Sequence, residues 1–445
     1  MKAWPPRLSR PRMVALLALV LVGAGSAWWM LTGPPELRLR TIIEPPEEFR
    51  LQLAEIQGFS PDGSILVIEH KIDNDPRTLI LRHARSGRIE KRIDSDLDET
   101  IPIESLDPTF YPAIFHAFSP DGSLLAVWLD DGNVIRILDT ATWEEKTAFR
   151  QDRTWRCRFF PDGKALLIQT MLGFTVWDVS KGERLETMEK WCDGEETRCW
   201  ISPDGRELKA VLERGPKKGE EDCVWQIGTW DGPTWALRRQ IERAWPGGLD
   251  DFEIAPDGRT LARVEGQNIV IEDIESGNPV TQLQLPEMPK SLEEGADYAL
   301  IKWSADGRHL LITGDGMLWL WDIKKPAAVP MAISFGQSPI CSSADGKLMG
   351  TELRRPILVN SWILRLPTAL QKSASWCFGE PHTTQPPSRI SLRDMSTGDV
   401  LAQATLDIPW VVSLAFSPDG STLAASDSHG RILLYDVPRT RKSRL

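Results

Sequence analysis

One short pattern recurs eight times along the chain and limits the folds that the chain can adopt. In its clearest copy, Ser413–Ser426, an apolar run leads into Ser-Pro-Asp-Gly, and a second run rich in Leu and Ala follows. Proline fixes the second position of a tight turn and glycine accepts the left-handed conformation, so each copy is predicted to be a β-hairpin. A period of about 40 to 50 residues is typical of a propeller or another repeat array. The turn aspartates are Asp62, Asp121, Asp162, Asp204, Asp257, Asp306, Asp345 and Asp419.

A second landmark follows the turns at a nearly constant distance. In five copies a short apolar run ends in an aspartate 16 to 18 residues after the turn aspartate. These are Asp139, Asp178, Asp273, Asp322 and Asp436. Trp230-Asp231 and Leu392–Asp394 fit the same role after longer insertions, whereas the first copy has Leu79–His83 in this place. Each unit is therefore predicted to contain four short strands.

These landmarks resemble the repeats of a known family. Ala415–Val437 is similar to a WD-repeat unit, and Thr175–Val179 and Trp319–Ile323 contain the Trp-Asp pair of that family. The resemblance extends over roughly residues 37–438. It implies an all-β fold, a β-propeller of four-stranded antiparallel blades, and a role as a scaffold. The chain has no Gly-His dipeptide, so the Asp–His network of regular WD repeats is not expected.

The repeats are consistent with two numbers of blades, eight or seven. Eight turn motifs predict eight blades, and seven is the alternative because the copy around Asp345 is degenerate. The last unit lacks an outer strand. In the WD-repeat family an N-terminal strand commonly completes the final blade, so Leu37–Ile43 is predicted to close the ring. The alternative is that this segment is an extended tether.

The N-terminal region has the pattern of a membrane anchor. Residues 1–12 form a basic tail, and residues 13–32 are predicted to be a transmembrane signal-anchor helix, because the 19 residues 13–31 carry no charge and would span about 28 Å. The basic flank favours a cytoplasmic N-terminus and an extracytoplasmic propeller. The alternative is secretion after cleavage of a signal peptide near Ala24–Ala27. Residues 33–36 are predicted to be a linker, 37–438 the propeller and 439–445 a basic C-terminal tail.

Composition and motifs narrow the classes of function. A net charge of -11 argues against a nucleic-acid partner, because phosphate binding needs a basic surface. The six histidines are scattered, and no catalytic, metal-binding or cofactor-binding motif is apparent, so we predict a monomeric, non-enzymatic propeller without a cofactor. The alternative is an extracytoplasmic propeller hydrolase, or a protein that binds a sugar or another small ligand in the central channel.

Four segments combine acidic and aromatic residues and connect an outer strand to the next inner strand. Such connections lie on one face of a propeller, and aromatic anchors in a polar surround are typical of protein-binding sites. These segments are Asp94–Pro112, Lys190–Trp200, Glu242–Asp251 and Leu285–Tyr298. The residues predicted to bind a protein partner are Tyr111, Trp191, Glu195, Trp245 and Tyr298. The alternative is that these are solubilising loops whose aromatic residues pack into their own blades.

The second of these segments also holds a pair of cysteines. Cys192 and Cys199 are separated by six residues and are predicted to form a disulfide if the propeller lies outside the cytoplasm. The other four cysteines are expected to be buried thiols, since spacing alone does not reveal connectivity. The complete prediction is a membrane-anchored scaffold that presents loops from one face of a rigid ring.

Overall fold

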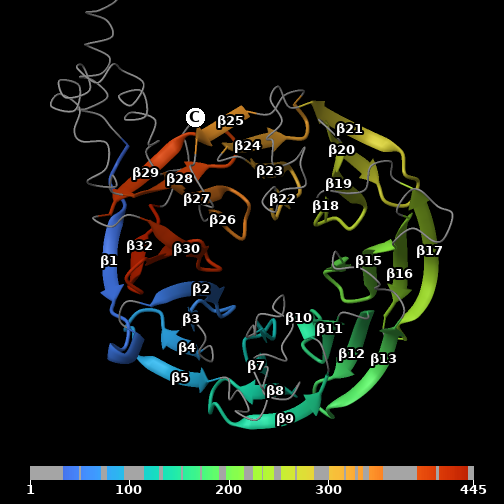
Figure 1. The fold of residues 1–445 in the computed structure, drawn as a ribbon, viewed down its shortest axis with the longest axis horizontal. Coiled ribbons are helices and arrows are strands. Elements are labelled where there is room, and N and C mark those ends of the chain that lie inside the picture. The colour runs from blue at the N-terminus through green and yellow to red at the C-terminus, as the bar shows by residue number, and fades with distance from the viewer. Residues whose placement is uncertain are drawn as a thin grey trace, which may run out of the picture.

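The eight repeats fold into eight four-stranded antiparallel sheets that form the blades of a closed ring (Figure 1). The all-β propeller predicted from the repeats is confirmed. The alternative of seven blades is wrong, because the degenerate copy around Asp345 still forms a complete sheet. This computed structural model describes residues 34–49, 52–71, 78–94, 115–129, 134–151, 154–170, 173–189, 197–214, 224–232, 234–244, 252–265, 268–284, 300–314, 317–325, 329–333, 340–353, 388–406 and 410–438.

Each blade is named here by its place in the chain, and its strands run in sequence order from the inner strand at the channel to the outer strand. Blade 1 consists of β2 (Leu53–Phe59), β3 (Ile65–Lys71), β4 (Thr78–His83) and β5 (Ile89–Asp94). Blade 2 consists of β6 (Phe115–Phe118), β7 (Leu124–Leu129), β8 (Val134–Asp139) and β9 (Glu145–Arg150). Blade 3 consists of β10 (Thr154–Phe159), β11 (Ala165–Thr170), β12 (Gly173–Asp178) and β13 (Glu183–Glu189). Blade 4 consists of β14 (Thr197–Ile201), β15 (Glu207–Arg214), β16 (Val224–Asp231) and β17 (Ala236–Ala244).

The second half of the ring repeats this order. Blade 5 consists of β18 (Phe252–Ile254), β19 (Thr260–Glu265), β20 (Asn268–Asp273) and β21 (Pro279–Gln284). Blade 6 consists of β22 (Leu300–Trp303), β23 (His309–Gly314), β24 (Met317–Asp322) and β25 (Val329–Ile333). Blade 7 consists of β26 (Ile340–Ser342), β27 (Leu348–Leu353), β28 (Arg389–Asp394) and β29 (Val400–Thr405). Blade 8 consists of β30 (Val411–Phe416), β31 (Thr422–Asp427), β32 (Ile432–Asp436) and, from the other end of the sequence, β1 (Arg38–Ile43).

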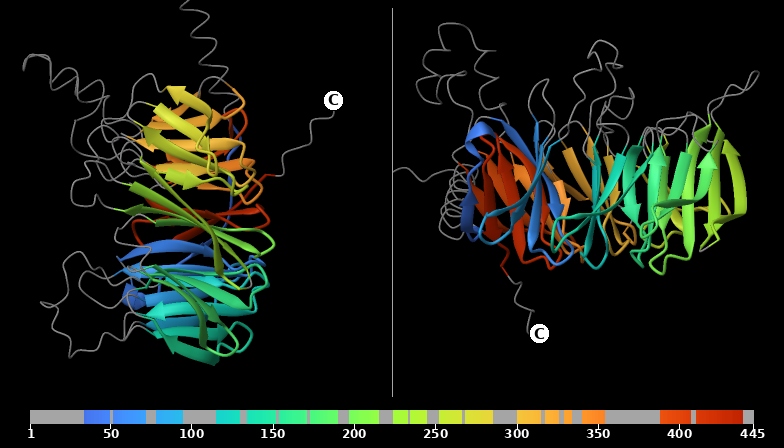
Figure 2. Two further views of the ribbon diagram at one scale, coloured as in Figure 1. Left: turned by 90° about the vertical axis from the view of Figure 1, so that its right-hand side faces the viewer. Right: turned by 90° about the horizontal axis from the view of Figure 1, so that it is seen from below.

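Antiparallel order within each blade gives the ring two distinct faces. The turns between first and second strands and those between third and fourth strands lie on one side, which we call the turn face. Connections between second and third strands, and between one blade and the next, start and end on the opposite side, which we call the loop face. Figure 2 shows the ring edge-on as a flat disc with the strand ends on these two faces.

The predicted closing strand is confirmed. β1 pairs antiparallel with β32, with Leu39 opposite Tyr435 and Ile43 opposite Ile432. The segment before β1 also contacts blade 7, which the sequence did not predict. The Leu37 amide donates a hydrogen bond to the carbonyl of Gln403 in the outer strand of blade 7, at 2.7 Å. The N-terminal segment thus joins the first, seventh and eighth blades, because it also continues through a short 3-10 helix, η1 (Glu47–Phe49), into β2.

A serine hydroxyl stabilises the recurring turn, in addition to the proline, aspartate and glycine that the sequence pattern indicates. In blade 1, Ser60 Oγ donates to Asp62 Oδ1 at 2.6 Å and accepts a hydrogen bond from the Ile65 amide at 2.9 Å. Gly63 has a φ of 71°, as the left-handed turn position requires. The same pair of serine and aspartate recurs in blades 2, 4, 6, 7 and 8. In these six blades the serine two residues before the aspartate is therefore part of the turn mechanism, whereas Phe160 and Ala255 take its place in blades 3 and 5.

The hydrophobic core is divided into clusters that lie between neighbouring blades. Between blades 2 and 3, Phe149 stacks on Trp177 with ring centroids 4.3 Å apart, and Trp128 is completely enclosed. Between blades 4 and 5, Trp225 meets Phe252 edge-on at 5.0 Å. Wide gaps between sheets need large side chains, and each aromatic ring buries much apolar area. Packing across blades therefore accounts for a large part of the 19 tryptophans in the sequence.

Candidate functional site

The residues predicted to bind a partner lie outside the described residues. These are Tyr111, Trp191, Glu195, Trp245 and Tyr298. The described strands do fix where their segments start and end: β5, β13, β17 and β21 finish on the loop face, and β6, β14, β18 and β22 begin there. The predicted disulfide stays a prediction, because Cys199 lies on β14 whereas Cys192 falls outside the described residues.

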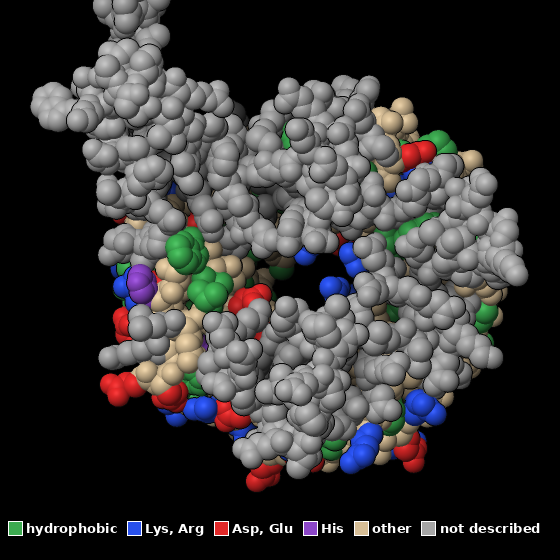
Figure 3. Space-filling model, in the orientation of Figure 1, with side chains coloured by type: hydrophobic (Ala, Val, Ile, Leu, Met, Phe, Trp, Pro, Cys, Tyr) green, Lys and Arg blue, Asp and Glu red, His purple; other side chains and the backbone are tan. Residues whose placement is uncertain are grey.

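The described part of the loop face includes two exposed apolar side chains. Leu53 begins β2 and is 44% exposed, and Trp410 immediately precedes β30 and is 38% exposed. Their strands belong to blades 1 and 8, which are neighbours in the ring and joined by the bond from the Ile56 amide to Ser413 Oγ. Figure 3 shows hydrophobic side chains exposed on this face over β30 and β2.

A pocket of about 530 Å³ opens on the wall of the central channel. Its lining comes mainly from the inner strands of blades 3 to 6, and three of its residues are arginines: Arg156 and Arg158 on β10 and Arg198 on β14. Arg156 and Arg158 are two positions apart on one strand, so their side chains leave the same side of it. Both are exposed, and among the described residues neither forms an ion pair. Figure 3 shows Lys and Arg side chains bordering the central opening.

Two tryptophans that line this channel pocket donate hydrogen bonds to the backbone of a neighbouring blade. Trp200 Nε1 donates to the carbonyl of Pro256 at 3.0 Å, and Trp303 Nε1 donates to the carbonyl of Glu253 at 3.1 Å. Gly258 leaves the space that the Trp200 ring occupies, since a Cβ there would lie 2.5 Å from that ring. These indoles therefore form walls of fixed shape between blades 4, 5 and 6.

The channel pocket offers no activated nucleophile among its described residues. Cys157 lies between the two arginines on β10, and burial raises the pKa of its thiol to about 12. A thiol with such a pKa stays protonated at neutral pH and is a poor nucleophile. Among the described lining residues Glu253 is the one carboxylate, against three arginines. The geometry therefore suits recognition of negative charge better than covalent catalysis.

Carboxylates surround the opposite mouth of the channel. All eight turn aspartates are exposed on the turn face, one on each blade. Hydrogen bonds from Ser119 and Ser123 hold the pKa of Asp121 below its usual range, and a Lys347 hydrogen bond helps lower the pKa of Asp345 to about 2. Both of these carboxylates are ionised at neutral pH. In five blades the turn also carries an exposed Lys or Arg two residues after the aspartate (Lys164, Arg206, Arg259, Arg308 and Lys347), so the turn face has mixed charge, whereas the pocket on the wall formed by blades 3 to 6 is lined by three arginines.

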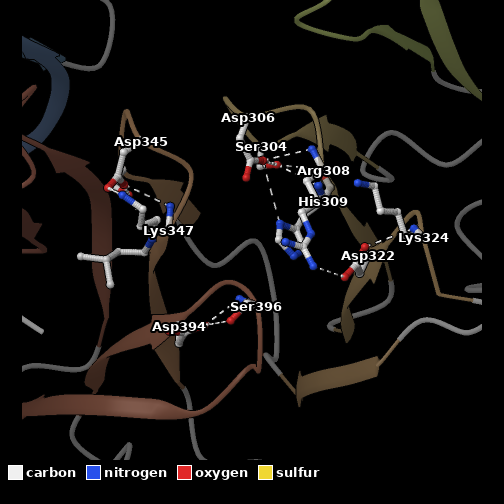
Figure 4. A network of polar contacts seen from close by, with 12 residues as sticks. Ser304, Asp306, Arg308, His309, Asp322, Lys324, Asp345, Lys347, Asp394 and Ser396 are labelled. Carbon is white, nitrogen blue, oxygen red and sulfur yellow. Dashed lines mark hydrogen bonds and ion pairs between the residues drawn. The ribbon is translucent and has the colours of Figure 1, made fainter. Parts of the chain in front are cut away.

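His309 lies in a cluster with Asp306, Asp322 and Asp394 at the turn face between blades 6 and 7 (Figure 4). His309 is only 3% exposed, and its Nδ1 is 4.0 Å from Asp306 Oδ1. Burial lowers the pKa of His309, so the ring is neutral at neutral pH. Asp306 and Asp322 already accept hydrogen bonds from Ser304 and Arg308. With the imidazole enclosed and the carboxylates engaged, this cluster lacks an open position for a substrate.

Two further features of the described residues bear on function. No group of three or more His, Cys, Asp or Glu side chains in these ranges is arranged to hold a metal ion. Within the same ranges, no helix has the length and apolar character needed to cross a membrane. The predicted signal-anchor at residues 13–32 lies outside them.

A buried histidine near the loop face predicts a pH dependence of stability. His70 is enclosed, stacks on Phe49 at 4.5 Å, and has a pKa lowered to about 4, chiefly by burial and then by Arg82 and Arg92. The unfolded chain therefore binds a proton between pH 6.5 and 4 that the folded chain excludes, so stability is lost as pH falls below 6.5. Between pH 7.5 and 4.5 this one group should cost about 2 to 3 kcal/mol.

This expectation can be measured by urea unfolding across that pH range. The variant His70→Phe keeps a ring against Phe49 and removes the titration, so its free energy of unfolding should fall less than that of the parent protein. His429→Gln, which replaces an exposed histidine, is the matched control. Equal pH dependence in the parent protein and His70→Phe would contradict the proposed role of His70.

Comparisons with known proteins agree with this fold. The family described as "WD domain, G-beta repeat" matches residues 403–436, the span from β29 to the end of β32. One repeat of the chain thus matches a WD repeat, and the eight four-stranded blades have the propeller fold. The crystal structure of the C-terminal WD40 domain of Sif2 is similar to this propeller with a TM-score of 0.53 and 13% identity, over 92% of this chain and 100% of that one. At that identity the likeness concerns the fold alone.

A curated relative is similar over a shorter stretch. It is the U3 small nucleolar RNA-associated protein 18 homolog of Arabidopsis thaliana, 25% identical over 114 residues. The matched stretch is 25% of the propeller chain and 19% of that relative, so the chain spans about a fifth of the relative's length. WD-repeat propellers typically act as scaffolds for protein interactions, but a shared fold does not by itself fix a function.

Proposed function

We propose that this WD-repeat propeller is a non-enzymatic scaffold that binds a protein partner through its loop face. The observation that carries the proposal is the exposed apolar pair Leu53 and Trp410 at the loop-face ends of two adjacent inner strands. An exposed tryptophan beside another apolar side chain is the type of residue that dominates binding energy when a partner covers it. On this proposal the predicted contacts Tyr111, Trp191, Glu195, Trp245 and Tyr298 would extend this surface, because the described strands before and after their segments end and begin on the same face.

Membrane attachment is the second part of the proposal. The uncharged residues 13–31 and the basic residues before them support a signal-anchor that leaves the propeller on the extracytoplasmic side. An anchor would raise the local concentration of the scaffold for partners in the same membrane. The alternative of a secreted propeller differs only in cleavage near Ala24–Ala27, which the mass of the mature protein would reveal.

The name of the Arabidopsis relative raises the question of an RNA-associated assembly. The net charge of -11 disfavours direct binding to a phosphate backbone. We therefore place the proposed contact with a protein, whether or not that protein belongs to a larger assembly.

Site-specific photo-crosslinking tests the loop-face proposal in the intact chain. A photoreactive residue at Trp410 should crosslink to a discrete protein in membranes that contain the partner, because this side chain lies on the proposed surface. Position Lys164 is the matched control, since it is exposed in a hairpin turn on the opposite face. Equal crosslinking from both positions, or none from Trp410, would contradict a site on the loop face.

A further inference from the structure

The channel pocket carries an inference that goes beyond the loop-face scaffold and is independent of it. Arg156 and Arg158 project from the same side of β10, the innermost strand of blade 3. Arg198 on the neighbouring β14 lines the same pocket, with its guanidinium 5.7 Å from the Phe252 ring centroid. The exposed Lys302 on β22, the inner strand of blade 6, is a fourth cation on these inner strands, outside the pocket lining. A protein of net charge -11 thus keeps a cluster of cations on one wall of its channel.

We propose that this wall binds an extended acidic peptide segment of a partner protein. In an extended peptide, alternate side chains point the same way and recur at about 6.6 to 7 Å. Carboxylates at two alternate positions therefore match Arg156 and Arg158, which have the same spacing on β10. β10 is also the inner edge of its sheet, with one side paired to β11, so its other edge faces the channel. An extended peptide is the form that recognition along a strand edge requires.

The surroundings of the pocket favour a short peptide over a polyanion. A volume of about 530 Å³ with three arginines in its lining fits a few carboxylates better than a long polyanion such as a nucleic acid. The inner strands of blades 1, 2, 5, 7 and 8 contain no Lys or Arg, so the cations of the described inner strands lie on blades 3, 4 and 6. The expected ligand enters from the loop face and presents two or three carboxylates to that wall.

Fluorescence anisotropy with a labelled peptide tests this assignment directly. The probe is an eight-residue peptide of alternating Glu and Ala, and the comparison peptide has Gln in place of every Glu. Each carboxylate that pairs with an arginine contributes a charge-assisted hydrogen bond, so Arg156→Ala/Arg158→Ala should weaken binding of the Glu peptide about tenfold or more. Binding should also weaken as salt rises, because the contact is electrostatic.

The matched control removes two arginines that are exposed elsewhere. Arg150→Ala/Arg206→Ala changes the net charge by the same amount, and Arg150 ends the outer strand β9 while Arg206 lies in a hairpin turn. This control should bind the Glu peptide within about twofold of the parent protein. Circular dichroism and urea unfolding of both double variants show whether the propeller is intact before binding is compared.

Three results would overturn the assignment. The first is equal affinity for the Glu and Gln peptides, and the second is equal loss of binding in the two double variants. The third is tighter binding of a single-stranded oligonucleotide of eight nucleotides than of the Glu peptide at the same salt concentration. Selective binding of the Glu peptide, lost in Arg156→Ala/Arg158→Ala and kept in the control, supports it. The loop-face proposal can fail without affecting this outcome, because the purified protein and peptide need no other partner.

Discussion

Deletion of the closing strand should destabilise the propeller more than any single substitution. A chain beginning at Glu44 would lack β1, expose the whole edge of β32 and remove the buried side chains of Leu37 and Ile43. Burial of each of these side chains contributes about 1.5 to 3 kcal/mol. The uncovered strand edge would also favour association between chains. We expect a lower urea midpoint for residues 44–445 than for 34–445, with aggregates in size-exclusion chromatography.

Two adjacent isoleucines provide a matched test of this closure. Ile43 is 5% exposed and packs against the turn at Gly87, where a Cβ would lie 3.2 Å from it, whereas Ile42 is 42% exposed. Ile43→Ala should cost about 2 to 4 kcal/mol of unfolding free energy, and Ile42→Ala less than about 1 kcal/mol. Equal losses in the two variants would mean that β1 does not pair with β32 in the register described.

Removal of the Glu272 carboxylate should have the second-largest effect. Glu272 on β20 is buried between Arg243 of the neighbouring blade 4 and Arg263 of its own blade, with both N–O distances 3.0 Å. Arg243 also donates to the carbonyl of Ile274 at 2.8 Å, so this network joins blades 4 and 5. Glu272→Ala would leave the buried Arg263 and the largely buried Arg243 without this carboxylate and should cost about 3 to 5 kcal/mol in urea unfolding.

An exposed ion pair in the same two blades is the control for that prediction. Arg239 and Glu275 also connect blades 4 and 5, at 2.9 Å, but each side chain is 50% exposed. Solvent screens such a pair, so Glu275→Ala should cost no more than about 1 kcal/mol. An equal loss of stability in Glu272→Ala and Glu275→Ala would contradict the claim that burial strengthens the Glu272 network between blades 4 and 5.

The repeats predicted most of the fold because the turn chemistry is local. Pro-Asp-Gly after an apolar run specifies a hairpin, and the aspartate that ends the third strand in every blade but the first marks the next turn. Asp178 shows why that residue recurs: its Oδ1 accepts hydrogen bonds from the amides of Ser180 and Lys181. Even the degenerate turn at Asp345 keeps Ser343 as its hydrogen-bond donor, at 2.7 Å.

The channel pocket could not be predicted in the same way. In the sequence Arg156, Arg158 and Arg198 are ordinary strand residues, and only the curvature of the ring brings β10 and β14 to one wall. The ion pair between Glu272 and Arg243 likewise depends on contact between blades 4 and 5. Such pairs leave no local pattern, since their members are tens of residues apart. The predicted loop contacts rest on composition alone and stay a prediction.

Affinity capture tests the central claim, that this propeller is a scaffold with a protein partner on its loop face. Tagged protein spanning residues 34–445 would be incubated with detergent-solubilised membranes and crosslinked, and the captured proteins quantified by mass spectrometry. The comparison is Trp191→Ala/Trp245→Ala, with Arg206→Ala on the turn face as the control. The proposal predicts one stoichiometric protein that the double variant loses and the control keeps. Capture of no specific protein, or equal capture by all three, would contradict it.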